Sequence, residues 1–302
     1  MNVEKIIKNT INLESKSYAA IIGGNPSEGA RSPQLWNAAF LDHGIDSLMH
    51  PFDIDAEDLP HLMEALNLDK LFLGGAISVP HKELVADWLI SKGDEYISRE
   101  AAAIGAVNSL YRKNGEIFGT NTDGEAALMS LKEECDDLQS KNVLLIGPGG
   151  AGKAVAAYIS HELETGVLKI SSRDIKKIQG FASNIDAKVI SWPPIETELA
   201  DSDVVVNCTI LGSSSFEDST PLSIEPENDQ AKVNLIKESA VVFDIIYDPS
   251  PTKLLDLSIA RGIKSIDGAK MNLEQAVLAF EYAVADNKGR ESIRKSMSAS
   301  LI

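Results

Sequence analysis

The chain has 302 residues, enough to bury the cores of about two domains. Hydrophobic residues make up 44% of it and charged residues 24%, which is typical of a globular protein. Forty-five acidic side chains against 28 basic ones give a formal net charge of −17, which repels polyanions at long range. We therefore expect neither nucleic acid nor an anionic membrane as a partner.

The N-terminal third alternates predicted strands and helices. Residues 18–23 form an apolar run that indicates a buried strand, and a polar loop with turn residues follows through Pro33. Pro33 suits the first turn of a helix from about residue 34 to residue 40, and Ser32 is equally well explained as its N-cap or as a ligand-binding residue. A strand through Met49, a helix at about 57–66 and a strand at 70–74 complete the pattern. Alternating elements predict an α/β fold with a mostly parallel sheet, whose ligands bind at the carboxyl ends of its strands.

The stretch from Gly74 to Lys82 stands at one such strand end. Lys82 falls in the first turn of a predicted helix, where the positive end of the helix dipole disfavours a cation. This unfavourable placement indicates a function, although a solvated surface lysine is the common alternative. Two further stretches, at 103–109 and 119–124, also contain polar residues that are candidates for a site. In the second, Asp123 is either an active-site residue or a cap for a helix at about 124–134.

Residues 142–153 predict a strand that runs straight into a glycine-rich turn and a helix. Gly147, Gly149 and Gly152 have the G-x-G-x-x-G spacing, which allows a tight turn, close approach of backbone to a pyrophosphate, and close packing of helix on strand. The helix, at about 151–163, would aim its N-terminal amides at that anion. A purely structural glycine turn is the alternative, but the next strand, at 168–171, arrives at the distance of a βαβ unit.

The C-terminal half continues in the same way. Residues 203–209 and 240–246 predict buried strands, and residues 213–238 predict a long loop with a short helix near 232–237. A helix opens after Asp267 and carries an apolar stripe of Leu273, Val277, Phe280 and Val284. The tail, residues 287–302, suggests no function.

In combination these stretches resemble the shikimate and quinate dehydrogenase family, over residues 18–282. The family motifs G-N-P-x-x-x-S-K-S-P, G-x-N-V-T-x-P-x-K, I-G-A-V-N-T, G-x-N-T-D-G, G-x-G-G-A and G-x-x-M-L-x-x-Q all have counterparts here. The resemblance implies a substrate-binding and catalytic domain at 1–122, to which residues 268–302 return, and a Rossmann-type cofactor domain at 123–267. It implies interconversion of shikimate and 3-dehydroshikimate with a nicotinamide cofactor, in aromatic amino acid biosynthesis.

The resemblance also assigns residues. The paired Lys and Asp of the family's active site fall on Lys82 and Asp123. A secondary alcohol needs a group that accepts its proton as hydride leaves, so Lys82 is the predicted proton-transfer group and Asp123 its orienting, substrate-binding partner. Predicted substrate-binding residues are Ser32, Ser78, Asn108, Tyr247 and Gln275; predicted cofactor-binding residues are Gly147, Gly149, Gly150, Ala151, Gly152, Ser172, Arg173, Thr209, Gly268 and Met271.

Arg173 and Asp174 bear on the choice of cofactor. An Arg just past the second strand of a Rossmann domain is suited to a 2′-phosphate, whereas an acidic residue suits the free ribose of NAD. Ser172 and Arg173 occupy the family's N-R positions, and Asp174 is most simply the N-cap of a helix reaching Ala182. We therefore expect NADP, with NAD possible. For Tyr247 and Met271, burial in ordinary packing is the alternative to ligand contact.

Two departures from the family pattern concern the substrate. Ala30 stands where the family has a serine for the substrate carboxylate, and Ala76 stands where it has Asn. A hydrogen bond to a charged group contributes roughly 1.5–3 kcal/mol, so a missing hydroxyl would weaken carboxylate binding about 10- to 100-fold. Either Ser27, Arg31 or Ser32 compensates, or the ligand is quinate or another cyclic hydroxy acid.

Two cysteines, Cys135 and Cys208, in a chain without a secretory segment or an apolar run of about 18 residues predict a reducing, cytoplasmic setting. The cysteines are expected to fill core space rather than to form a redox pair. The partner is a small cyclic hydroxy acid, no metal is expected, and the oligomeric state is not readable. A non-catalytic, cofactor-binding regulatory protein is the alternative from another functional class.

Overall fold

The computed structural model describes residues 3–13, 16–284 and 289–301. The chain divides into two compact units, here called unit 1 (Met1–Thr122 and Leu273–Ile302) and unit 2 (Asp123–Asn272). The units divide between Thr122 and Asp123, and the chain returns to unit 1 at Leu273, whereas the predicted return was at residue 268. Helix α11 (Gly268–Ala283) therefore begins in unit 2 and ends in unit 1.

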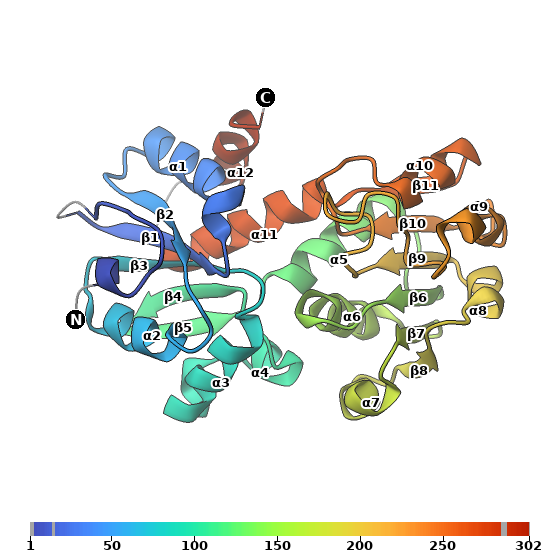
Figure 1. The fold of residues 1–302 in the computed structure, drawn as a ribbon, viewed down its shortest axis with the longest axis horizontal. Helices are drawn as coiled ribbons and strands as arrows, with labels where there is room; N and C mark the ends of the chain where they lie inside the picture. Colours follow the sequence, from blue (N-terminus) through green and yellow to red (C-terminus); the bar gives the residue numbers. More distant parts are fainter. Residues whose placement is uncertain (1–2, 14–15, 285–288, 302) are drawn as a thin grey trace. The chain divides into compact units, whose positions relative to one another are not determined.

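Unit 1 is built around a five-stranded sheet of order β2-β1-β3-β4-β5 (Figure 1). Strands β1, β2 and β3 are parallel, and β4 and β5 form an antiparallel hairpin. The elements of unit 1, apart from α11, are η1 (Val3–Lys5), β1 (Tyr18–Gly23), η2 (Pro26–Glu28), α1 (Ser32–His43), β2 (Leu48–Asp53), α2 (Leu59–Leu68), β3 (Phe72–Ile77), α3 (Lys82–Lys92), η3 (Asp94–Tyr96), α4 (Arg99–Ile104), β4 (Ser109–Lys113), β5 (Glu116–Thr120) and α12 (Arg290–Ala299).

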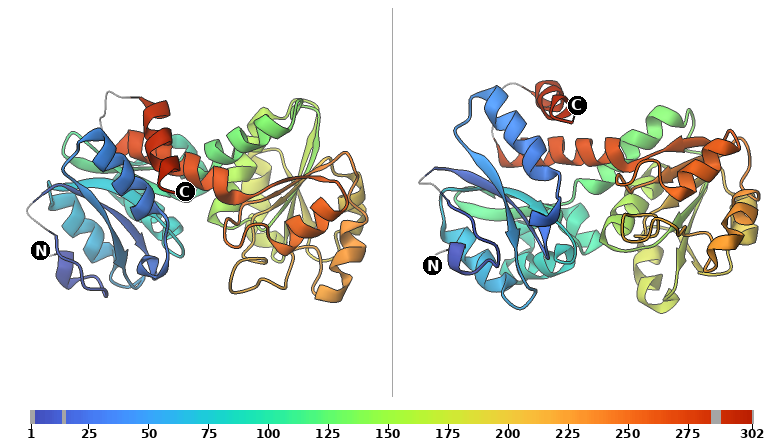
Figure 2. Two further views of the ribbon diagram at one scale, coloured as in Figure 1. Left: turned by 90° about the horizontal axis from the view of Figure 1, so that it is seen from above. Right: turned by 45° about the horizontal axis from the view of Figure 1, so that its top comes forward.

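Helices cover both faces of this sheet because alternate residues of β1 point to opposite sides. Ala20 and Ile22 belong to a core that includes Leu62 of α2 and Val85 of α3. On the other face, Ile21 belongs to a core formed with α1, α11 and α12. The helices α1 and α12, which lie far apart in the sequence, pack side by side in that layer (Figure 2).

Unit 2 has a six-stranded, all-parallel sheet of order β11-β10-β9-β6-β7-β8. The chain winds outward from β6 to β8 and then returns to β9, so the order reverses between β6 and β9. Ligands of open parallel sheets bind at such a point. The elements are α5 (Asp123–Glu134), β6 (Asn142–Ile146), α6 (Gly150–Glu162), β7 (Val167–Ser172), α7 (Ile175–Asn184), β8 (Lys188–Ser191), α8 (Glu196–Asp201), β9 (Val204–Asn207), η4 (Pro226–Asn228), α9 (Asp229–Val233), β10 (Val241–Asp244), α10 (Lys253–Ala260) and β11 (Lys264–Ile266).

Several local predictions need correction. Ser32 is not an N-cap: Arg31 already has helical dihedral angles, so Ser32 is the first residue of α1. The second strand continues past Met49 to Asp53, and Pro51 is tolerated because β2 lies at the sheet edge. The short helix of the long loop is α9, which ends at Val233 instead of spanning 232–237.

Other local predictions are confirmed. Lys82 is the first residue of α3, and Asp174 caps α7 by accepting the backbone N–H of Lys177 at 3.1 Å. In the predicted apolar stripe, Val277, Phe280 and Val284 are buried in one core, and Leu273 is partly buried against it. Both cysteines are free.

In the part of the chain that the structure describes, no helix is long and apolar enough to cross a lipid bilayer.

Candidate functional site

The glycine turn after β6 leaves room above its backbone. Gly147 has φ +94°, a left-handed conformation that favours glycine, and a Cβ there would approach Thr209 Cγ2 to 2.5 Å. A Cβ on Gly152 would approach the Gly147 carbonyl oxygen to 2.1 Å, so the helix can pack this closely only with glycine. At Gly149 a Cβ would meet nothing within 4 Å. The turn is therefore crowded beneath Gly147 and Gly152 and open at Gly149, as a backbone cradle for an anion requires.

A cavity of about 550 Å³ opens beside this turn, at the carboxyl ends of β6, β7 and β9. Its volume suits a nucleotide-sized ligand. Helix α6 begins at Gly150, next to the cavity, and its first N–H groups have no partners within the helix. The lining residues are Ile146, Gly147, Pro148, Gly149, Ser171, Ser172, Arg173, Asp174, Trp192, Cys208, Thr209, Ile210, Leu211 and Phe216.

Arg173 is an exposed cation at the edge of this cavity. The neighbouring Asp174 caps α7 through one carboxylate oxygen, Oδ1, and also lines the cavity. The Ser172 hydroxyl is held by the same turn: it accepts the Asp174 N–H at 3.1 Å and donates to the Asp174 carbonyl at 3.0 Å. Arg173 is the cationic side chain among the residues that line the cavity, so it is the one suited to a phosphate.

Thr209 lines the cavity and is held by a hydrogen-bonded network at the end of β9. The Asn207 side-chain oxygen accepts both the Thr209 N–H at 2.9 Å and the Thr209 hydroxyl at 2.8 Å. The Asn207 amide donates to Asp244 Oδ1 at 3.0 Å and to the Leu211 carbonyl at 3.0 Å. The Thr252 hydroxyl donates to the other oxygen of Asp244 at 2.7 Å. The loop that carries Thr209 is thus tied to β10 and α10.

Asp244 is fully buried at the centre of this network. Burial raises its pKa to about 6, although its hydrogen bonds from Thr252, Ile246 and Asn207 act in the opposite direction. Burial also raises the pKa of the Cys208 thiol, with a contribution from the Asp244 carboxylate. Cys208 therefore remains a thiol at neutral pH. It is half-buried and lines the cavity, so of the two cysteines only Cys135, which is buried, fits the predicted role of core filler.

The remaining predicted residues of unit 2 do not line this cavity. Gly268 begins α11, and a Cβ there would approach the Ile245 carbonyl oxygen to 2.1 Å, so its role in the structure is close packing on the end of β10. Met271 is buried, and Tyr247 is half-buried in the loop after β10. Asp123 is buried as the first residue of α5. Gly150, Ala151 and Gly152 belong to the first turn of α6.

In unit 1, predicted residues gather at the carboxyl ends of β1 and β3. Ser78 follows β3 directly, and its hydroxyl donates to the Ile22 carbonyl at 3.3 Å, at the end of β1. Lys82 begins the next helix, where its carbonyl accepts the Val107 N–H at 2.9 Å. This bond ties the start of α3 to the segment that carries Asn108.

Asn108 and Gln275 are joined through one residue that the sequence analysis did not select. Asn108 is buried; its amide donates to Thr122 Oγ1 at 3.0 Å, and its oxygen accepts the Thr122 N–H at 2.8 Å. The Thr122 hydroxyl in turn donates to the Gln275 carbonyl at 3.1 Å. Two predicted substrate-binding residues, 167 positions apart in the sequence (275 − 108), therefore share a common anchor.

The segment that departs from the family pattern is partly committed to other contacts. Ala30 packs against the apolar core beneath α1, Ala76 is buried, and Ser32 is buried at the start of the helix. The Ser27 hydroxyl donates to the buried carboxylate of Asp53, and its N–H donates to Asp53 Oδ1 at 2.9 Å. Ser27 is therefore a poor substitute for the serine that Ala30 replaces.

Among residues 3–13, 16–284 and 289–301, no group of three or more His, Cys, Asp and Glu side chains could hold a metal ion. The residues that sequence reasoning missed are Thr122, Asn207, Asp244 and Thr252. The one available signal was a polar residue as the last residue of a buried strand, as in Asn207 of β9 and Asp244 of β10.

Comparisons with known proteins agree along most of the chain. Residues 22–110 match the shikimate dehydrogenase substrate binding domain, and residues 129–247 match shikimate / quinate 5-dehydrogenase. A shikimate dehydrogenase (NADP(+)) of Bacillus licheniformis is 33% identical over 277 residues, covering 90% of this chain and 93% of the relative.

Solved structures give the same result. Shikimate dehydrogenase from Aquifex aeolicus superposes with a TM-score of 0.80 at 27% identity, covering 95% of this chain and 99% of that one. Quinate dehydrogenase from Corynebacterium glutamicum, in complex with NAD, gives a TM-score of 0.79 at 25% identity, covering 94% and 99%.

Proposed function

This chain belongs to the shikimate dehydrogenase family, and we propose that it is an NADP-dependent oxidoreductase that interconverts shikimate and 3-dehydroshikimate. The cavity at the carboxyl ends of β6, β7 and β9, with Arg173 at its edge, is the observation that carries the choice of cofactor. The alternative of a non-catalytic regulatory protein finds no support among the relatives.

The residues of unit 2 fit NADP. The open space above Gly149 and the start of α6 suit the pyrophosphate, and the exposed Arg173 suits the 2′-phosphate. Thr209 lines the same cavity from the β9 loop. The nicotinamide supplies hydride transfer when bound. Gly268 and Met271 remain proposed cofactor-binding residues on the family pattern.

For the substrate we propose that Lys82 moves the proton of the reacting hydroxyl and that Asp123 orients the substrate. Oxidation of a secondary alcohol requires a proton acceptor as hydride leaves, and reduction requires the same group as donor. Asn108 and Gln275, held by Thr122, and the neighbouring Ser78 are proposed to bind ring hydroxyls. Ser32 is proposed for the carboxylate, and Tyr247 completes the set of proposed substrate contacts.

The second candidate is a relative that acts on quinate or another cyclic hydroxy acid. The packing of Ala30 against the core favours it, because no hydroxyl stands at that position and Ser27 is bonded to Asp53. Quinate carries an additional ring hydroxyl, so its affinity depends less on any single contact to the carboxylate.

The test is the reduction of NADP and of NAD, followed by absorbance, with shikimate and quinate each offered over a wide concentration range. Saturable turnover of shikimate with NADP is the expected result. Turnover of quinate at equal or greater kcat/KM would establish the second candidate instead. A Lys82→Ala variant should lose at least about 100-fold in kcat, and unchanged turnover would refute the role of that lysine.

A further inference from the structure

Helix α12 is a fixed part of unit 1. Ile293 and Met297 are buried in the core that also contains Phe280 of α11. Ser296 donates a hydrogen bond of 2.5 Å to Asp42 of α1. The side chains on its neighbouring face are therefore held at defined positions against α11.

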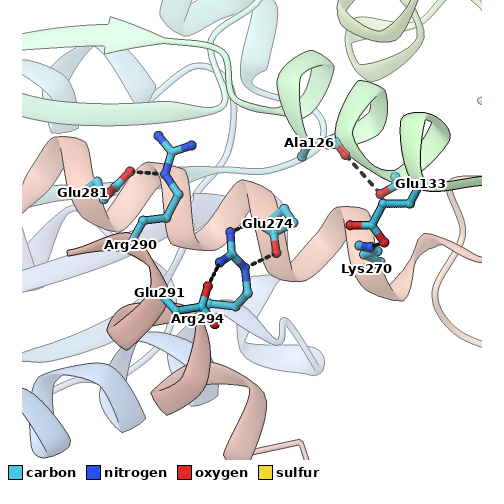
Figure 3. Close-up of polar contacts among 9 residues, drawn as sticks. Ala126, Glu133, Lys270, Glu274, Glu281, Arg290, Glu291 and Arg294 are labelled. Carbon is cyan, nitrogen blue, oxygen red and sulfur yellow. Dashed lines mark hydrogen bonds and ion pairs between the residues drawn. The ribbon is translucent and has the colours of Figure 1, made fainter.

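One of those side chains makes a two-point ion pair with α11 (Figure 3). Arg294 Nε donates to Glu274 Oε1 at 2.5 Å, and Arg294 Nη2 donates to Glu274 Oε2 at 2.8 Å. A third donor of the guanidinium bonds Glu291. The Glu274 side chain is only 3% exposed. A carboxylate this deeply buried requires a partner that satisfies both its oxygens, and the planar fork of an arginine does so.

Glu274 directly precedes Gln275. The backbone carbonyl of Gln275 is held by Thr122, in the segment that follows β5. The Gln275 carbonyl accepts the Thr122 hydroxyl, which itself accepts from the Asn108 amide. This turn of α11 is thus anchored at consecutive residues, at Glu274 by a side chain of α12 and at Gln275 by the segment after β5. Because a peptide unit is rigid, the two anchors together define where the Gln275 side chain leaves the helix.

We propose that Arg294 is a positioning residue: through Glu274 it holds Gln275 in the orientation that binds a ring hydroxyl of the substrate. This inference rests on the proposed function of Gln275 and gives the C-terminal helix a role in substrate affinity. Arg290 and Glu281 supply an internal comparison, since they join the same two helices about two turns further along α11. That pair is more exposed, with 30% of the Glu281 side chain accessible.

The test compares Arg294→Met with Arg290→Met in the full-length protein. We expect Arg294→Met to raise the KM for shikimate about 10-fold, with less than about twofold change in kcat and in the KM for NADP. Arg290→Met should leave all three constants within about twofold. Arg294→Lys should fall between, since an ammonium cannot make the two-point contact. An equal rise in KM in both methionine variants would overturn the proposal.

A double variant separates positioning from stability. Glu274→Leu with Arg294→Met removes both charges, and apolar replacement of a buried ion pair commonly preserves stability. We expect this double variant to have the melting temperature of the native protein but to keep the raised KM for shikimate of Arg294→Met. Recovery of KM together with the melting temperature would mean that Arg294 acts only on stability, and the proposal would fail.

A spectroscopic readout does not depend on turnover. The side-chain amide resonance of Gln275, assigned by its loss in Gln275→Leu, should shift in Arg294→Met and stay unchanged in Arg290→Met. If the native enzyme turned over neither shikimate nor quinate, the proposed function would be wrong, whereas an unshifted resonance would contradict the inference itself.

Discussion

Arg173 is the single side chain on which the choice between NADP and NAD depends most. It lies exposed beside the cavity at the end of β7, and Asp174 is occupied as the cap of α7. An acidic residue that bonded the ribose would favour NAD, and Asp174 already uses its Oδ1 to accept the Lys177 N–H.

Replacement of Arg173 tests this assignment. A charge-assisted hydrogen bond contributes roughly 1.5–3 kcal/mol, so Arg173→Gln should raise the KM for NADP about 10- to 100-fold and leave that for NAD within about threefold. Lys176→Gln, which removes one positive charge from α7, is the matched control and should change neither. An equal effect on both cofactors would show that Arg173 does not contact a 2′-phosphate.

At the scale of elements, the loop after β9 is held in place by residues that do not line the cavity. Asn207 bonds Thr209 and Asp244 together, and Thr252 holds Asp244 from the start of α10. The position of Thr209 is therefore set jointly by two strands and a helix, and substitutions outside the cavity should alter cofactor binding.

We expect Thr252→Val to raise the Kd for NADP about 3- to 10-fold, because the lost hydrogen bond leaves Asp244 less constrained. Thr220→Val is the control: Thr220 also donates to a buried aspartate, Asp229 at 2.7 Å, in the same unit. Both variants should lose comparable stability, and only the first should weaken cofactor binding in a fluorescence titration. Equal Kd values for NADP in the two variants would mean that the network around Asp244 does not affect cofactor binding.

The buried Asp244 also links the stability of unit 2 to pH. Its pKa rises from the ordinary 3.8 to about 6 on folding because it is desolvated. A carboxyl that binds its proton more tightly when folded adds stability that is present below about pH 4 and is lost as pH rises through 6. The size is on the order of 3 kcal/mol.

Asp244→Asn should remove this dependence. Relative to the native protein, the free energy of unfolding of the variant should increase between pH 4 and pH 7 by on the order of 3 kcal/mol. Urea unfolding at a series of pH values measures it, with Asp256→Asn on α10 as an exposed control. A difference that stays constant with pH would mean that Asp244 does not titrate in this range.

For the whole molecule, the net charge of −17 opposes the approach of anionic ligands. Salt screens this repulsion, since the Debye length shortens from about 30 Å at 0.01 M to about 8 Å at 0.15 M. We therefore expect kcat/KM for NADP and shikimate to rise about twofold over that range while kcat stays constant. A fall in kcat/KM with salt would indicate that local positive charge, rather than the net charge, controls encounter.

The parts of the fold that follow short-range rules were predictable from sequence. The spacing of Gly147, Gly149 and Gly152 located β6 and α6 to within a residue, because the turn depends on backbone conformation at those positions. The β4–β5 hairpin was missed, although Asn114-Gly115 at its turn, with φ +53° and +86°, is a strong hairpin signal. The N-cap role, one of two alternatives for Ser32, was wrong because the helical conformation begins one residue earlier, at Arg31.

The sequence by itself determined the family, the α/β class and the residue types available for hydride and proton transfer, since these depend on local motifs. Only the tertiary structure decided which of those residues are joined. Thr122 bonds both Asn108 and Gln275, and Arg294 of α12 bonds Glu274 of α11. Such contacts arise when segments far apart in the sequence pack into one core, and no local spacing encodes the distance between them.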